Sequence, residues 1–263
     1  MKMVRKKQTG HGKMKEYIPI ISINNEIYMK DKVIVLGGCH VTGYPYSSAD
    51  SFVYKLHKFS DFDIFIEGNV TIKKLNNGLK LSNDNKYILL QLGHYETSFT
   101  LREYLLGRRK RRLVGERESV SSISSNSLTI TDGINNIGFK FFLNDFLKYG
   151  LKIIREIFSR SLLDEKNIHS NLNQFFTNLK ELNIKNVIVL SSFYSASIPT
   201  NSYRKRYNEI LSNITLKYGY QYIDVFNHLR VNTKKNNYYY SDAIHLTKNS
   251  IELLSNFINS VLK

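Results

Sequence analysis

Three residues of this sequence could together perform nucleophilic catalysis: Cys39 as the nucleophile, His245 as the base that activates it, and Asp242 as the carboxylate that orients the base. A carboxylate beside an imidazole accepts the Nδ1 proton and leaves Nε2 free to act as a base. The single cysteine lies in residues 33–43, an apolar run that enters a glycine turn. α/β proteins place ligands and nucleophiles at such strand ends. We therefore predict a Cys39-His245-Asp242 triad.

Each part of this triad also has an ordinary structural explanation. A lone cysteine is often buried and inert. Asp242 and His245, which precede an amphipathic stretch at 248–262, would equally suit a helix cap followed by a surface histidine. The combination, at the two ends of one α/β pattern, favours catalysis.

Two segments resemble the SGNH (GDSL-type) hydrolase superfamily of esterases, lipases and acyltransferases. Residues 242–247 look like that family's C-terminal Asp-x-x-His block, and residues 35–43 look like its Gly-Asp-Ser nucleophile block. Cys39 stands where the family has serine, and Gly38 where it has aspartate. A thiol keeps nucleophilic catalysis feasible, because a neighbouring imidazole can generate the thiolate. The resemblance spans residues 31–100 and 162–262.

The resemblance also implies an oxyanion hole. Gly68 falls at the glycine of the family's second block, so the backbone N–H groups of Cys39 and Gly68 would hold the oxyanion. Residues 90–96 look like the family's Gly-x-Asn-Asp block, but Tyr95 and Glu96 replace its Asn and Asp. Tyr95 or His94 would then have to supply the donor that the Asn provides.

The implied function is acyl transfer, by an esterase, thioesterase or acyltransferase, through a covalent thioester on Cys39. The alternative is a non-catalytic SGNH-like protein that binds a carbohydrate or acyl ligand, which the altered block around Tyr95 favours. His40, Glu96 and Tyr240 are candidate substrate contacts, although His40 would equally suit the first polar residue of a helix turn, and Tyr240 would equally suit packing of its loop.

Alternation of short apolar runs with amphipathic stretches predicts the fold. We expect strands at 33–36, 63–66, 86–92, 186–190 and 220–225, and helices at 48–59, 139–158, 165–182, 203–218 and 248–262. Such alternation gives a three-layer α/β/α sandwich with a mainly parallel central sheet. In the SGNH family this sandwich is flavodoxin-like. Residues 17–263 would form one domain, after a basic, disordered tail at 1–16.

Residues 101–161 interrupt this alternation and are expected to form a helical insertion, a candidate lid. The apolar side of its helix, 139–158, should pack against the domain; covering an acyl chain or lying at a membrane interface are the alternatives. The insertion also holds a basic cluster, which would dock an acidic acyl carrier protein or anionic lipids, or form a solvated loop. Its arginines are Arg108, Arg109, Arg111 and Arg112.

Charge and composition narrow the function classes. The net charge of +16 over 263 residues favours an anionic partner or substrate. No nucleic-acid-binding module accompanies it, which argues against nucleic acid as that partner. A single cysteine excludes an intramolecular disulfide and argues against a cysteine-based zinc site, so we expect no metal or cofactor. No apolar run approaches the roughly 20 residues of a membrane span, and we expect a cytoplasmic protein, with membrane association left open.

Overall fold

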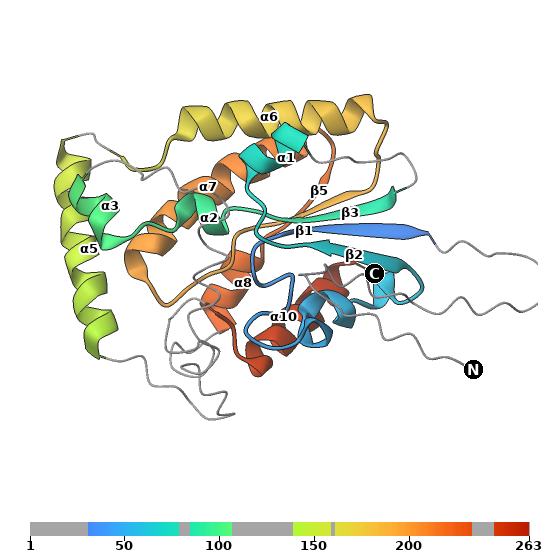
Figure 1. Ribbon diagram of the computed structural model, residues 1–263, viewed down its shortest axis with the longest axis horizontal. Coiled ribbons are helices and arrows are strands. Elements are labelled where there is room, and N and C mark those ends of the chain that lie inside the picture. The colour runs from blue at the N-terminus through green and yellow to red at the C-terminus, as the bar shows by residue number, and fades with distance from the viewer. Residues whose placement is uncertain (1–30, 79–84, 107–138, 159–160, 233–244, 263) are drawn as a thin grey trace, which may run out of the picture.

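Five parallel strands form the centre of the molecule (Figure 1). The computed structural model describes residues 31–78, 85–106, 139–158, 161–232 and 245–262. The strand order is β2-β1-β3-β4-β5, and each neighbouring pair is parallel. The strands are β1 (Lys32–Gly37), β2 (Asp63–Glu67), β3 (Asn85–Gln91), β4 (Val187–Leu190) and β5 (Gln221–Ile223). All five lie close to the predicted positions.

Apolar layers cover both faces of this sheet. In β3, Ile88 and Leu90 join one layer, whereas Leu89 joins the other, because successive strand residues point to opposite faces. Figure 1 shows helices on both sides. The first face carries α1 (Ile72–Gly78), α6 (Glu165–Glu181) and α7 (Ile198–Lys217), and the second carries α8 (Val225–Asn232) and α10 (Lys248–Val261). The three-layer α/β/α sandwich is confirmed.

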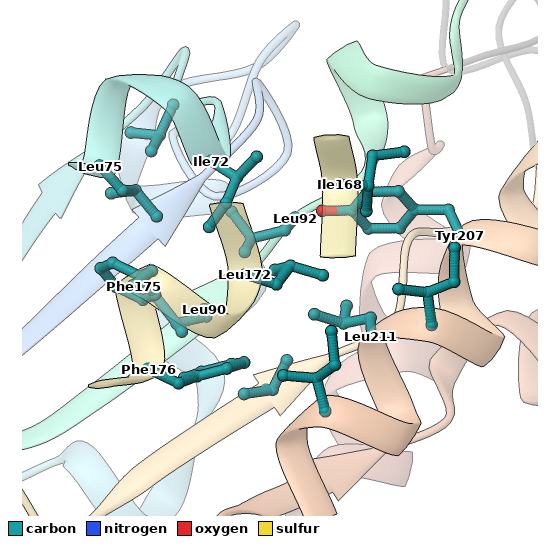
Figure 2. Close-up of a cluster of buried hydrophobic side chains, with 14 of the residues drawn as sticks. Ile72, Leu75, Leu90, Leu92, Ile168, Leu172, Phe175, Phe176, Tyr207 and Leu211 are labelled. Atoms are coloured by element: carbon teal, nitrogen blue, oxygen red, sulfur yellow. The ribbon is translucent and has the colours of Figure 1, made fainter. Parts of the chain in front are cut away.

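The first layer is built around aromatic rings from α6. Phe175 and Phe176 point from α6 toward Leu90 of β3, with Leu172 beside them (Figure 2). The Phe176 ring is fully buried, and its centroid lies 5.5 Å from that of Tyr220. Such a ring contributes both apolar burial and close packing to stability.

Phe176→Ala should therefore lower the free energy of unfolding by about 3–5 kcal/mol, the usual cost of deleting a buried phenylalanine ring. Chemical denaturation followed by circular dichroism measures this. Phe65→Ala, on β2, removes the same ring from a side chain that is 53% exposed, and should cost under about 1 kcal/mol. Equal losses in the two variants would contradict the assignment of the core.

The helix predicted over 48–59 is wrong. The segment forms three 3-10 turns, η1 (Ser48–Asp50), η2 (Phe52–Lys55) and η3 (His57–Phe59). Two residues with extended backbone, Ser51 and Leu56, separate the turns. The Ser51 hydroxyl accepts from Val53 N and donates to Val41 O, so it competes with helical hydrogen bonding. The apolar residues of the segment still face the core as expected.

The expected orientation of α5 (Phe139–Ile157) is also wrong. Its polar side faces the domain: Asp145 accepts from the backbone N–H of Ile198 at 3.1 Å, and Arg155 Nε donates to Tyr104 O at 2.7 Å. Within the described residues, seven apolar side chains of 139–158 that were expected to be buried are 42–73% exposed: Phe142, Phe146, Leu147, Ile153, Ile154, Ile157 and Phe158. The reason is electrostatic, because the unpaired amides at the start of α7 and the carbonyls at the end of α3 (Leu101–Leu106) attract charged side chains. The lid, acyl-cover and membrane-interface roles stay predictions.

Among the described residues, four helices were missed, α1, α2 (His94–Thr97), α3 and α8, and one begins earlier than predicted. All four are short, with four to eight residues, which is too few to show a clear helical repeat of apolar residues. α7 begins at Ile198, because Ser197 caps its first turn and proline follows at Pro199. In the part of the chain that the structure describes, no helix is long and apolar enough to cross a membrane. The basic tail at 1–16 and the cluster Arg108, Arg109, Arg111 and Arg112 lie outside the described residues.

Candidate active site

Cys39 lies in a tight turn directly after β1. Gly38 donates its N–H to Gln91 Oε1 at 3.1 Å, and Thr42 Oγ1 donates to Cys39 O at 2.7 Å. A side chain at Gly37 would place its Cβ 2.8 Å from Val41 and 2.9 Å from the backbone oxygen of Gln91. Only glycine therefore fits where the strand turns. The turn leaves the Cys39 thiol half-buried at the carboxyl end of the sheet.

The fold brings His245 to this thiol across 206 positions of sequence. His245 Nε2 lies 3.1 Å from Cys39 Sγ, and the Tyr44 ring packs edge-on against the imidazole at 4.7 Å between centroids. His245 stands just before Thr247, the N-cap of α10. Asp242 and Tyr240 lie outside the described residues, so their places in the site stay predictions.

Two further imidazoles face the same sulfur. His94 Nε2 lies 3.7 Å from Cys39 Sγ, and His40 Nδ1 lies 3.8 Å from it. His94 opens the short helix α2 (His94–Thr97), directly after β3, and Gly93 before it has φ +93°. The His40 ring is buried and packs edge-on against Phe193, with centroids 4.9 Å apart. The thiol and the three imidazoles therefore converge from the ends of β1 and β3 and from the start of α10.

The other predicted site residues lie around this cluster. A Cβ at Gly68 would lie 2.4 Å from Thr42 Cγ2 and 3.9 Å from Gly38 O, so the Gly68 backbone is packed against the turn that carries Cys39. The Tyr95 hydroxyl donates to Asn69 Oδ1, beyond β2. The structure thus brings His94 within reach of the sulfur, whereas the Tyr95 hydroxyl bonds to Asn69.

Glu96 serves the backbone of neighbouring loops. Its two carboxylate oxygens accept from the N–H of Ile72 at 2.9 Å and of Gly93 at 3.1 Å, and the side chain is buried. These bonds tie the start of α1 to the turn that carries His94. A substrate contact by Glu96 stays untested, but both of its oxygens already hold this turn.

Arg204 is a site residue that sequence reasoning missed. Its guanidinium is fully buried under the cluster, and Nη2 lies 3.1 Å from Nδ1 of His94. Nη1 donates to the carbonyl of Phe193. The available signal was its helical spacing: Arg204, Asn208, Leu211 and Thr215 recur at intervals of four, three and four along α7, and all are buried. An arginine within a buried stripe indicates a specific partner.

No protein-family model and no curated protein matches the sequence, but solved structures match the fold. The lipase/acylhydrolase from Enterococcus faecalis superposes with a TM-score of 0.54 at 12% identity, over 88% of this chain and 94% of that one. A protein of the G-D-S-L family from Desulfitobacterium hafniense DCB-2 gives 0.51 at 11% identity, over 88% and 99% of the two chains. A catalytic mutant of an acetylxylan esterase from Geobacillus stearothermophilus gives 0.51 at 9% identity, over 87% and 92%.

The chain has the SGNH-hydrolase fold. In doubly wound sheets with this strand order, ligands bind beyond the carboxyl ends of the strands, where the winding reverses between β1 and β3. Here β2 and β3 lie on opposite sides of β1. Cys39 follows β1 and His94 follows β3, so the cluster lies at this switch point, where sheets of this strand order bind ligands.

The electrostatics of this site favour a thiolate. Burial raises the pKa of the Cys39 thiol, but the imidazoles of His94, His40 and His245 lower it, and the resulting pKa lies well below the usual value. Contact with Nε2 of His245 contributes to this lowering. A cysteine with a lowered pKa beside an imidazole is the activated form of the nucleophile.

His94 differs from an ordinary histidine. Burial lowers its pKa; the Cys39 thiolate opposes this effect and Arg204 adds to it, so that the pKa is about 4. His94 is therefore neutral at pH 7. A neutral imidazole carries no net charge, so how His94 meets the sulfur depends on which of its ring nitrogens carries the proton.

A thiol among imidazoles also raises the question of a metal. The described residues contain no group of three or more His, Cys, Asp or Glu side chains arranged to hold a metal ion. The guanidinium of Arg204 behind His94 would also repel a divalent cation. The arrangement suits proton transfer and nucleophilic attack.

Proposed function

We propose that this protein is an acyl-transfer enzyme of the esterase, thioesterase or acyltransferase type, in which Cys39 is the nucleophile and His245 the base. The observation that carries the proposal is the 3.1 Å separation of Cys39 Sγ and His245 Nε2 at the carboxyl end of β1. The SGNH-hydrolase fold supports it, because the lipase/acylhydrolase and the acetylxylan esterase share this architecture. Asp242 would orient His245 through Nδ1.

The first half of the reaction forms a thioester. His245 takes the thiol proton, and the thiolate attacks the carbonyl carbon of an ester or thioester, forming the S–C bond while the carbonyl electron pair moves to oxygen. The backbone N–H groups of Cys39 and Gly68, together with Nε2–H of His94, would stabilise this oxyanion. When the oxyanion collapses, the bond to the leaving group breaks, and the leaving alkoxide or thiolate takes the proton from His245.

The second half releases the acyl group. His245 takes a proton from water, or from a bound alcohol or amine, as that nucleophile attacks the thioester carbonyl. The S–C bond then breaks, the acid, ester or amide departs, and Cys39 regains the proton from His245. Thioesters retain reactivity toward amines, so transfer and hydrolysis are both open to this site. The net charge of +16 supports an anionic acyl donor.

Trapping the intermediate tests this function. Mixing the protein with p-nitrophenyl acetate, quenching in acid and measuring intact mass should show one acetyl group, mapped by peptide digestion to Cys39. Neutral hydroxylamine should remove it, as it does a thioester. Protein first alkylated with iodoacetamide is the control and should gain no acetyl group.

The same experiment separates catalysis from ligand binding. An absent adduct, or acetylation confined to other residues, would overturn the nucleophile assignment. Saturable binding of an acylated sugar or a fatty acid without any adduct would then support a binding protein.

A further inference from the structure

Arg204 is a buried charge that the catalytic scheme does not yet use. It projects from α7, is fully buried, and directs its guanidinium to the carbonyl of Phe193 and to Nδ1 of His94. A buried cation is costly unless it is paired and hydrogen-bonded. Arg206, two positions further along α7, lies instead at the surface: its side chain is 48% exposed and pairs with Glu165. The burial of Arg204 therefore serves a partner inside the molecule.

The chemistry of the guanidinium decides which nitrogen of His94 carries a proton. An arginine donates hydrogen bonds and accepts none. Nδ1 of His94, 3.1 Å from Nη2 of Arg204, must therefore be the acceptor and lacks a proton. In a neutral imidazole the other nitrogen is then protonated. That nitrogen, Nε2, lies 3.7 Å from Cys39 Sγ.

We propose that Arg204 is a positioning residue that holds His94 in the tautomer with its proton on Nε2, so that His94 donates to the thiolate and to the oxyanion that forms beside it. This inference rests on the acyl-transfer function proposed above. Two histidines beside the sulfur would then have different roles: Nε2 of His245 accepts a proton, whereas Nε2 of His94 donates a hydrogen bond. The His94 imidazole would thereby replace the oxyanion donor that the Gly-x-Asn-Asp block supplies in the family.

Two properties of the surroundings support this division. The pKa of about 4 for His94 keeps its imidazole neutral throughout the range in which His245 would act, so His94 does not compete as a base. A cationic donor on Nδ1 also polarises the ring and strengthens the hydrogen bond from Nε2. Among the described residues, the titratable or charged groups that face His94 are Cys39, His40, Tyr95, Arg204 and His245.

The tautomer can be measured in the wild-type protein without any substrate. Two-bond ¹⁵N–¹H correlation spectra of the histidine side chains, assigned with His94→Ala, should show His94 with protonated Nε2 and bare Nδ1 from about pH 5 to 8. A His94 signal with its proton on Nδ1, or one that titrates near the ordinary value of about 6.5, would overturn the proposal.

Arg204→Met removes the donors and the charge while keeping the length of the side chain. We expect the pKa of His94 to rise toward its ordinary value and the spectrum to show mixed tautomers. Turnover of a p-nitrophenyl ester should lose about 10- to 100-fold in kcat, with KM little changed, because an orienting partner is lost and the donor itself remains. Arg206→Met is the matched control on the same helix and should change neither quantity.

A double substitution separates positioning from general support. If Arg204 acts through His94, adding Arg204→Met to His94→Ala should not lower kcat further. An undiminished second loss would overturn the proposal. Should Arg204→Met fail to fold, the wild-type tautomer still decides the matter. An absent acetyl adduct on Cys39 would refute the proposed function alone, because the tautomer spectra need no acyl transfer.

Discussion

Cys39→Ala should abolish the acyl-transfer activity, with a loss in kcat of roughly 10⁶-fold, comparable to removal of the nucleophile from a serine-protease triad. The reason is that the variant lacks the sulfur that would form the covalent intermediate, which lies 3.1 Å from Nε2 of His245. Steady-state hydrolysis of a p-nitrophenyl ester measures the loss. The thiol is half-buried at a loop, so the variant should keep the wild-type unfolding midpoint.

Cys39→Ser is the informative companion to this variant. A hydroxyl in the same turn can still be deprotonated by His245, and serine stands at this position in the SGNH family, which residues 35–43 resemble. We expect measurable but reduced turnover and an acyl adduct that resists neutral hydroxylamine. Wild-type activity in Cys39→Ala would contradict the mechanism outright.

His245→Ala should lower kcat by roughly 10⁴-fold or more and make the thiol less reactive at neutral pH. The imidazoles lower the pKa of Cys39, and His245 does so both by charge and by hydrogen bonding. Removing it should therefore move the thiol pKa upward, toward about 8.5. The thiolate fraction at pH 7 would fall accordingly.

The pH dependence of iodoacetamide alkylation, read as intact mass, measures this shift on the only cysteine of the chain. Wild type should react at a pH well below the value for a free thiol, and His245→Ala should need a higher pH. His169→Ala, which removes an exposed histidine from α6, is the control and should leave the profile unchanged. Coincident profiles for wild type and His245→Ala would show that the pair is not coupled.

The sequence predicted the sheet well because the strands depend on local pattern. Residues such as Val189 and Leu190 belong to a short run that is buried on both faces, and only a central parallel strand needs such a run. The segment 48–59 failed for the opposite reason. Its apolar spacing fits a helix, but the hydroxyl of Ser51 bonds to the distant backbone of Val41, a contact that no local pattern contains.

Only part of the site could be predicted from the sequence, because local pattern marks some of its residues and not others. Cys39, His94 and His245 could be proposed because each follows or precedes a recognisable element. The partner of His94 could not, since Arg204 lies 110 positions away on a helix whose buried stripe mixes polar and apolar residues. The predicted orientation of α5 was wrong because Asp145 accepts from a backbone N–H at the start of α7, and Arg155 donates to a backbone carbonyl near the end of α3. Tertiary electrostatics then outweighs the amphipathic pattern.

The solitary thiol has a consequence for oxidation chemistry. A thiolate is the form of cysteine that peroxides attack, and the sulfenic acid that results is normally rescued by forming a disulfide with a second cysteine. This chain has no second cysteine, so the rescuing thiol has to come from another molecule. An acyl group on the sulfur would meanwhile block the oxidant. Under the proposed mechanism, the resting protein is thus the oxidant-sensitive form, and turnover would itself protect the sulfur.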